Sequence, residues 1–202
     1  MATILSAQST DRTINRVTPA LFARWPNAAA LAEADRADVE EMVKSTGFFR
    51  NKAKAIQEAS RVLTSEHGGE VPKDVDAVVA LPGVARKTAN VVLGTAYGIA
   101  TGMVVDTHVR RVSQRLGLTR QNDPDKIEAD LCATFHKRSW IETSHRLLLH
   151  GRYVCLAKAP RCDRCVLNEL CEERIGDAGE TIAARASAAK RVVESRGDEA
   201  LA

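Results

Sequence analysis

Residues 81–90 read LPGVARKTAN, and this stretch decides how the rest of the chain is interpreted. Pro82 and Gly83 are residues that favour a tight turn. Lys87 follows the turn at the head of an apolar stretch that ends at Tyr97. The helix dipole disfavours a cation in the first turn of a helix. The position of Lys87 therefore requires a functional explanation.

The flanking residues predict a helix on each side of this turn. Asp74 is a helix cap for the short stretch VDAVVA, and a second helix is expected from Arg86 to Tyr97, ending at Gly98. Backbone N–H groups at the start of the second helix can hold a phosphate oxygen without reading any base. Such contacts would come from the turn positions Leu81, Gly83 and Ala85. An ordinary connection between two helices is the alternative, and LPGV alone would favour it.

Length and composition predict an all-α protein of one or two domains. The chain has 202 residues, and only 4% of them are aromatic. Abundant Ala, Leu, Val, Arg and Glu favour packed helices over sheets. The chain lacks a run of eighteen apolar residues, and its first residues, MATILSAQSTD, do not resemble a signal peptide. We therefore expect a cytoplasmic protein with no membrane partner.

Positive charge is concentrated in residues 81–164. This segment holds 14 Lys and Arg residues against 7 Asp and Glu residues, which gives it a net charge of +7. The whole chain has a formal charge of only +3, so the remainder carries −4. The concentration indicates a polyanionic partner, although a solvated charged face is an equally good explanation of charge alone.

Further helices are predicted along the chain, with no strand-like alternation of any length. Asp106 and the pair Asp123–Pro124 are expected to start two of them. The helical stretches besides those at the turn are 35–44, 52–63, 107–117, the segment after Pro124, and 141–154. Residues 176–202 form a low-complexity tail rich in Ala, Gly and charged residues, for which we expect a loosely held helix or disorder.

Four of the five cysteines are crowded into seventeen residues. Cys155, Cys162, Cys165 and Cys171 have the spacing C-x6-C-x2-C-x5-C, whereas Cys132 stands apart as a small buried residue. Disulfides fit poorly with a cytoplasmic chain. Structural zinc is usually held by two separated knuckles, and only one C-x2-C is present. The spacing favours an iron–sulfur cluster and leaves zinc as the alternative.

A carboxylate completes the pattern that the lysine begins. Asp106 lies in VVDTH at residues 104–108, at the expected start of a helix. If this helix start and that of Lys87 face one cleft, an amine and a carboxylate meet beside a bound phosphate. Each residue taken alone is as well explained as a surface lysine or a plain helix cap.

Together these motifs resemble the endonuclease III family of helix-hairpin-helix DNA glycosylases. The resemblance rests on LSAQSTD (5–11), LPGVARKTANVVLGTAYG (81–98), VVDTHVRRV (104–112), LLLHGRYVC (147–155) and the cysteine spacing. It extends from residue 1 to about residue 174 almost without gaps. It implies a [4Fe-4S] cluster bound by the four crowded cysteines, which makes zinc improbable.

The resemblance also implies a mechanism. Asp106 stabilises the positive charge that forms on the sugar as the bond to the base breaks. Lys87 is the nucleophile that adds to the sugar and forms a Schiff base, after which the 3′ phosphate is eliminated. Attack requires a neutral amine, and the helix start together with partial burial would favour that form. The unfavourable position of Lys87 would then be its activation.

Further roles follow from the same resemblance. Gln8 would fill the space left by the extruded nucleotide, and Phe48, or its neighbour Phe49, would wedge the opposite strand. Asp11 would orient the extruded base. His108 is a candidate for the base pocket, although a packed histidine is the simpler interpretation. Lys158 and Arg161, on the loop between Cys155 and Cys162, look like contacts to backbone phosphates.

The sequence departs from the family pattern in three ways. The family hairpin reads LPGVG, whereas Ala85 stands at its second glycine here, which would strain the turn if that position needs a positive φ. Val79 and Ala80 lie where an acid often precedes the hairpin. The chain also starts within the family's second helix, so we expect the N-terminal helix to be missing.

We therefore predict an all-α protein with two helical lobes. Residues 1–99 would form a truncated six-helix barrel with the hairpin, and residues 100–175 a lobe with Asp106 and the [4Fe-4S] cluster. The predicted activity, carried out by a monomer near the bacterial nucleoid, is removal of oxidised pyrimidines from double-stranded DNA, with cleavage at the abasic site. The alternatives are an adenine-mismatch glycosylase, which Lys87 argues against, and a non-catalytic damage-binding paralogue.

Overall fold

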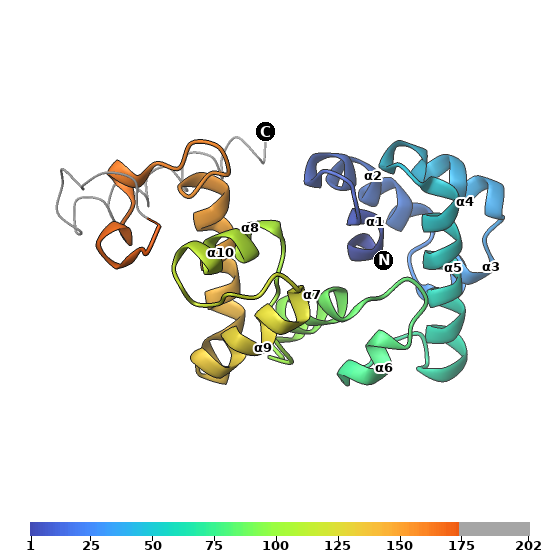
Figure 1. Ribbon diagram of the computed structural model, residues 1–202. Helices are drawn as coiled ribbons and strands as arrows, with labels where there is room; N and C mark the ends of the chain where they lie inside the picture. The colour runs from blue at the N-terminus through green and yellow to red at the C-terminus, as the bar shows by residue number, and fades with distance from the viewer. Residues whose placement is uncertain (174–202) are drawn as a thin grey trace. The chain divides into compact units, whose positions relative to one another are not determined.

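The computed structural model describes residues 1–173 and divides the chain into two compact units (Figure 1). The first unit comprises Met1–Thr101, and the second begins at Gly102. All regular secondary structure within residues 1–173 is helical. None of the helices in this range is long and apolar enough to cross a membrane.

The first unit is arranged around α5 (Phe49–Glu66), which lies beside α3 (Ala28–Glu33) and α4 (Arg36–Val43) (Figure 1). Its other helices, in chain order, are α1 (Ala2–Ser6), α2 (Asp11–Arg24), η1 (Lys44–Thr46), α6 (Val75–Val79) and α7 (Arg86–Tyr97). The core contains Leu5, Leu21 and Ile56, whose burial stabilises the unit by about 1.5–3 kcal/mol per side chain.

Side-chain caps fix where several of these helices begin. Thr10, Asn27, Asp35 and Asp74 each accept a hydrogen bond from a backbone N–H in the first turn of the helix that follows. A cap of this kind contributes about 1 kcal/mol. The cap at Asp74 matters most for function, because it sets the start of α6 immediately before the turn at residues 81–85.

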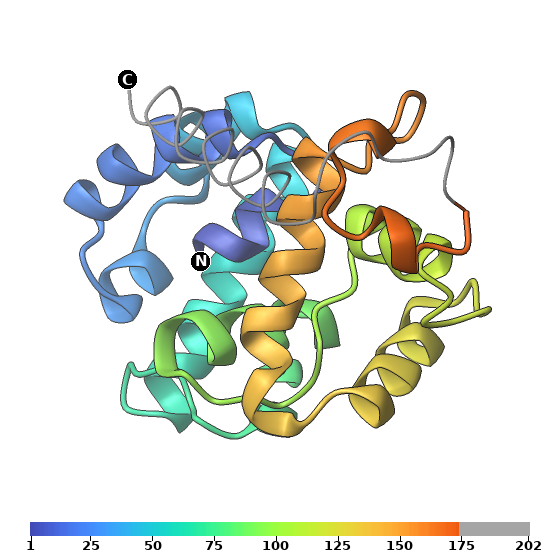
Figure 2. The same ribbon diagram turned by 90° about the vertical axis from the view of Figure 1, so that its left-hand side faces the viewer.

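The second unit is arranged around two packed helices, α8 (Thr107–Arg115) and α10 (Trp140–Tyr153). A Cβ added at Gly151 would lie 2.9 Å from the Cβ of His108, so the two helices approach closely. The unit also contains α9 (Pro124–Thr134), η2 (Lys137–Ser139), η3 (Cys162–Arg164) and η4 (Asn168–Leu170). Figure 2 shows the cysteine-bearing segment at the C-terminal end of α10.

The all-α prediction is confirmed over residues 1–173, and several predicted helix limits agree with the structure. Examples are α7, which ends before a left-handed Gly98, and α9, which Asp123 caps. Helix α2 was not predicted, and it contains Pro19 in its interior. The lobe assignments as barrel and cluster domain stay predictions, and the tail at 176–202 lies outside the described residues.

Candidate DNA-binding site and cysteine pocket

The turn at residues 81–85 is held against the rest of the first unit by apolar contacts. Leu81 is buried, and Val84 donates a backbone hydrogen bond of 3.1 Å to the Leu81 carbonyl. Gly83 has a φ of +76°, and a Cβ added there would lie 2.7 Å from the Cβ of Ala55. The turn therefore requires glycine at this position, both for its backbone conformation and for its approach to α5.

The second position of concern, Ala85, carries no such requirement. Its φ is −87° and its ψ is 165°, an extended conformation that any residue adopts. Ala85 is the N-cap of α7, and its methyl group cannot accept a hydrogen bond from the first turn. The departure from the LPGVG pattern is therefore harmless to the backbone, and the helix start has no side-chain cap.

Lys87 lies in the first turn of α7, and its side chain is exposed. The sequence had suggested that Lys87 is partly buried. This expectation is wrong, because the structure has the residue exposed. The opposite face of the same helix is buried and includes Ala89, Asn90 and Leu93. Lys87 thus projects from a helix whose opposite face is fixed in the core.

Asp106 is the N-cap of α8, as predicted, and one of its carboxylate oxygens makes both capping contacts. Oδ1 accepts hydrogen bonds of 2.9 Å and 2.8 Å from the backbone N–H groups of His108 and Val109. Within residues 1–173, Oδ2 of Asp106 forms no hydrogen bond. One oxygen therefore fixes the carboxylate, and the other can face a substrate.

His108 is placed by α8 and by an arginine on the same helix. Its Nδ1 lies 3.2 Å from Nη2 of Arg111, which also donates to the carbonyl oxygens of Gly151 (2.7 Å) and Cys155 (3.0 Å). Arg111 thus connects the helix start at Asp106 to the end of α10. His108 is half-buried in this contact, as the simpler interpretation of a packed histidine requires.

Gln8 and Phe48 share an uncommon backbone conformation. They have φ values of +53° and +47° and are the only non-glycine residues with positive φ in the described part of the chain. Phe48 is 68% exposed, whereas Phe49 packs against the hydrophobic core of the first unit. Phe48 is therefore the residue available as a wedge. Asp11 lies near Gln8 as the first, exposed residue of α2.

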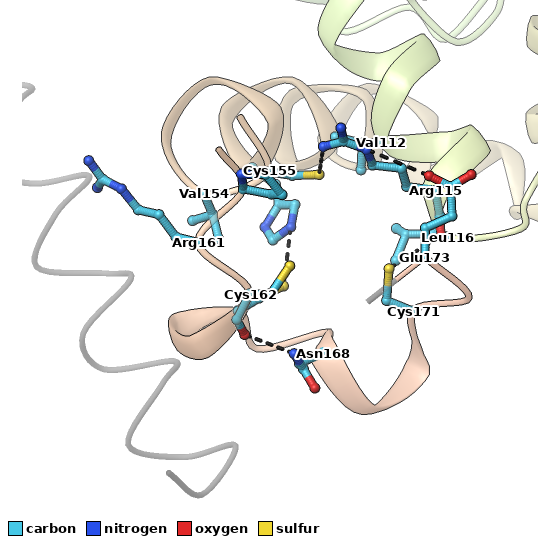
Figure 3. Close-up of a pocket in the computed structure, with 13 residues that line it drawn as sticks. Val112, Arg115, Leu116, Val154, Cys155, Arg161, Cys162, Asn168, Cys171 and Glu173 are labelled. Atoms are coloured by element: carbon cyan, nitrogen blue, oxygen red, sulfur yellow. Dashed lines mark hydrogen bonds and ion pairs between the residues drawn. The ribbon is translucent and has the colours of Figure 1, made fainter. Parts of the chain in front are cut away.

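The four crowded cysteines line one pocket in the second unit (Figure 3). Cys155 follows the end of α10, Cys162 starts η3, and Cys165 and Cys171 directly follow η3 and η4. None of the five cysteines, which all lie within the described residues, forms a disulfide bond. Burial raises the pKa of the Cys165 thiol, and the three other thiols in the pocket raise it further.

Two side chains that the sequence did not single out contact these thiols. Nη1 of Arg115 donates to Sγ of Cys155 at 3.3 Å and to the Leu156 carbonyl at 2.8 Å (Figure 3). Nε2 of His150 lies 3.5 Å from Sγ of Cys165, and burial lowers the pKa of His150. Both residues hold the cysteine segment against α8 and α10.

The two predicted phosphate-binding cations lie on the loop between Cys155 and Cys162. Lys158 is exposed, and Arg161 is half-buried with its side chain directed away from the cysteines (Figure 3). The backbone of Arg161 donates a 3.0 Å hydrogen bond to the Val154 carbonyl, which closes the loop. The loop thus presents two cations close to the cysteine pocket.

The chain was compared with known protein families and with related proteins. Residues 1–136 match the HhH-GPD superfamily of base excision DNA repair proteins. The chain belongs to this superfamily. Relatives named endonuclease III support the assignment: the Synechocystis protein is 56% identical over 171 residues, covering 85% of this chain and 78% of the relative. The Bacillus subtilis protein is 45% identical over 174 residues, covering 86% and 79%.

Two solved structures share the fold of this chain. A trapped covalent intermediate of endonuclease III with DNA matches with a TM-score of 0.80 at 42% identity, covering 85% of this chain and 81% of that one. A thermostable thymine-DNA glycosylase at 20% identity shares the fold, with a TM-score of 0.75. The chain is therefore a base-excision repair enzyme of the DNA glycosylase and lyase class.

Sequence reasoning about this HhH-GPD protein missed Arg111, Arg115 and His150. Arg111 and Arg115 are four residues apart, so they share one face of α8, and this spacing was a usable signal. His150 lies five residues before Cys155 in the same apolar helix. A histidine in that position gave no indication of a thiol contact, because its partner Cys165 is fifteen residues away in sequence.

Proposed function

We propose that this enzyme removes oxidised pyrimidines from double-stranded DNA and then cleaves the strand at the abasic site by β-elimination. The observation that carries the proposal is the position of Lys87. Its exposed amine projects from the first turn of α7, immediately after a turn that Gly83 fixes. A primary amine beside a phosphate-binding turn is the group that such a lyase reaction needs.

The lysine performs the covalent steps. The neutral amine of Lys87 adds to C1′ of the damaged nucleotide, and the base leaves with the electrons of the glycosidic bond and a proton. The sugar ring opens to a Schiff base between C1′ and Nζ. Loss of a proton from C2′ then expels the 3′ phosphate, and water releases the lysine.

The carboxylate of Asp106 stabilises the charge that develops on the sugar. Its Oδ1 is held by two backbone N–H groups at the start of α8, which keeps Oδ2 available for the reacting centre. Lys87 belongs to the first unit and Asp106 to the second. The proposal requires both to act on the same extruded sugar.

Backbone phosphates are bound without reading the sequence. The turn positions Leu81, Gly83 and Ala85 precede a helix start that has no side-chain cap, which leaves backbone donors suited to a phosphate oxygen. Lys158 and Arg161 would neutralise further phosphates, so binding should weaken as the salt concentration rises.

We assign extrusion of the nucleotide to Gln8 and Phe48, the two non-glycine residues with positive φ within residues 1–173. Gln8 would enter the vacated space, and the exposed ring of Phe48 would separate the bases of the opposite strand. Asp11 and His108 are the candidates for contacts with the extruded base.

The cysteines would hold a [4Fe-4S] cluster. Cys155, Cys162, Cys165 and Cys171 line one pocket, yet within residues 1–173 no three metal-binding side chains lie close enough to hold a single ion. Four spaced thiols would suit a polynuclear cluster better than one zinc ion. The bound cluster would supply a cross-link between the end of α10 and the segment through Cys171.

The partner of this reaction is a DNA duplex with one damaged base or abasic site, and we propose that a single chain acts on it. A chromosomal substrate would place the enzyme with the nucleoid in the cytoplasm. No second protein enters the proposed chemistry.

An oligonucleotide assay tests the activity. Duplexes with one oxidised pyrimidine, one abasic site or one adenine mispair are incubated with the purified protein. We expect cleavage of the first two, leaving an unsaturated aldehyde at the 3′ end. Removal of the mispaired adenine without cleavage of the oxidised pyrimidine would show the mismatch activity instead. Binding to all damaged duplexes without any product would show a non-catalytic protein.

A further inference from the structure

Lys52 is a buried lysine with no role in the chemistry proposed above. Only 6% of the residue is exposed, and it forms no salt bridge within residues 1–173. Its Nζ donates to the Thr46 carbonyl at 2.7 Å and to the Ser9 hydroxyl at 3.4 Å. Burying a charged group costs free energy unless its hydrogen-bond donors are satisfied. The burial of a lysine at this position therefore calls for an explanation.

The contacts of Lys52 join the two loops that carry Gln8 and Phe48. Ser9 follows Gln8 directly, and its hydroxyl donates to the same Thr46 carbonyl. Thr46 ends η1, two residues before Phe48. The backbone N–H of Lys52 donates to the Phe48 carbonyl at 3.1 Å. That backbone bond belongs to the first turn of α5, so the lysine side chain itself reaches the two loops at Ser9 and at Thr46, both within the first unit.

Both loops hold a non-glycine residue in a conformation that is unfavourable by itself. A left-handed backbone is unfavourable for such a residue and persists only where its surroundings enforce it. The Thr46 carbonyl, at the end of η1, accepts hydrogen bonds from both the Lys52 ammonium and the Ser9 hydroxyl. Lys52 thus supplies a charge-assisted contact where the two strained loops meet.

We propose that Lys52 is a positioning residue for nucleotide extrusion, whose ammonium joins the Gln8 loop to the Phe48 loop and fixes how far apart the two side chains stand. The inference rests on the proposed function, in which both side chains enter the duplex. An enzyme that lacks this contact would still carry Lys87 and Asp106. It would fail in opening the duplex and would keep its chemistry on a nucleotide that is already unpaired.

Lys52→Met tests the proposal, because methionine keeps an apolar stem and cannot donate. The matched control is Lys54→Met on the same helix, where the exposed lysine pairs with Glu58 at 3.8 Å. For Lys52→Met we expect excision of an oxidised pyrimidine from duplex DNA to slow by about tenfold to a hundredfold. Borohydride trapping on single-stranded abasic DNA should stay within about twofold of the wild-type rate. The control should change neither rate.

A fluorescent base opposite the lesion separates extrusion from general damage to the fold. Its signal should rise on binding of the wild type and of Lys54→Met, and should remain low with Lys52→Met. Ser9→Ala removes both hydroxyl contacts, from Lys52 and to the Thr46 carbonyl, but leaves the contact of Lys52 with Thr46, so it should show the same defect to a smaller degree. Equal losses on duplex and single-stranded substrates, or no loss on either, would overturn the proposal.

Failure of the proposed function would be recognised separately. If the wild type forms no trapped adduct, the lyase assignment fails, whatever the Lys52 variants do. Amide hydrogen exchange in the free protein then still decides whether the contact exists. Lys52→Met should accelerate exchange at residues 8–10 and 46–48 at least tenfold, and unchanged exchange there would contradict the proposed contact.

Discussion

The hairpin region (α6, the turn at residues 81–85, and α7) and the cysteine segment (155–173) are held in place by different forces. The hairpin rests on buried apolar residues, with Leu81, Val78 and Ala89 all less than one tenth exposed. After Val154, Cys165 is the only buried apolar residue in the described part of the chain. The cysteine segment depends instead on hydrogen bonds and, by our proposal, on the cluster. Loss of the cofactor should therefore disorder one region and leave the other intact.

The largest effect is expected from removing a thiol that binds the cluster. Cys165→Ser should abolish iron binding and the visible absorption of the proposed cluster, because Cys165 is the most buried of the four proposed ligands. Amide exchange should accelerate over residues 155–173 and stay unchanged at residues 81–97. Cys132→Ser is the matched control, since Cys132 lies outside the pocket, and it should retain iron. Retention of iron by Cys165→Ser would refute this ligand assignment.

A substitution that the tight packing of the hairpin cannot accommodate should lower the free energy of unfolding. Gly83→Ala places a methyl group 2.7 Å from Cβ of Ala55 at a φ of +76°, so we expect a loss of about 2–4 kcal/mol in the free energy of unfolding. Chemical denaturation measures this loss, and iron content should not change. Ala85→Gly, at a φ of −87°, should cost about 1 kcal/mol or less. Similar losses for both variants would contradict the description of the turn.

A smaller effect is expected where the cysteine segment meets α8. Arg115→Leu removes the donor to Cys155 Sγ and leaves the carbonyls of Leu156 and Ala157 without it. We expect a loss of about 1–3 kcal/mol and faster release of iron on dilution or mild oxidation. Arg120→Leu breaks only an exposed pair with Glu172 and should leave iron release unchanged. Equal iron release by the two variants would show that the thiol contact has no role.

The smallest effect concerns the pH dependence of stability. Burial lowers the pKa of Lys52 below its ordinary value of 10.5, so the charged form is penalised in the folded state. The penalty is fully present when the pH lies below the pKa of Lys52 in the folded state. It is relieved as the pH rises from that pKa towards the value of 10.5 in the unfolded state. The stability of the wild type relative to Lys52→Met should therefore increase with pH in the window just below 10.5. A flat difference between the two denaturation series across this window would argue against the burial effect.

The sequence predicted the fold class and several helix limits because local signals decide them. Capping residues such as Asp106 and Asp123 and the terminating Gly98 act over a few residues, and the structure has them in those roles. The helix α2 escaped prediction because Pro19, normally a helix breaker, lies inside it.

The candidate site was only partly predictable, for the same physical reason. Motif spacing marked Lys87, Asp106 and the four cysteines as candidates. It gave no indication of Lys52, whose partner Ser9 is 43 residues away, or of the Arg115 contact with Cys155 across 40 residues. It also suggested partial burial for Lys87, whose side chain is exposed. Contacts between distant segments and the exposure of one side chain depend on tertiary packing.

The central claim is that Lys87 is the nucleophile, and covalent trapping tests it most directly. The protein is mixed with duplex DNA that carries one abasic site, reduced with borohydride, and digested for peptide mapping by mass spectrometry. We predict a stable adduct on the peptide that contains Lys87, and its loss in Lys87→Ala with iron content unchanged. An adduct of undiminished yield in Lys87→Ala, or one mapped to another lysine in the wild type, would contradict the claim.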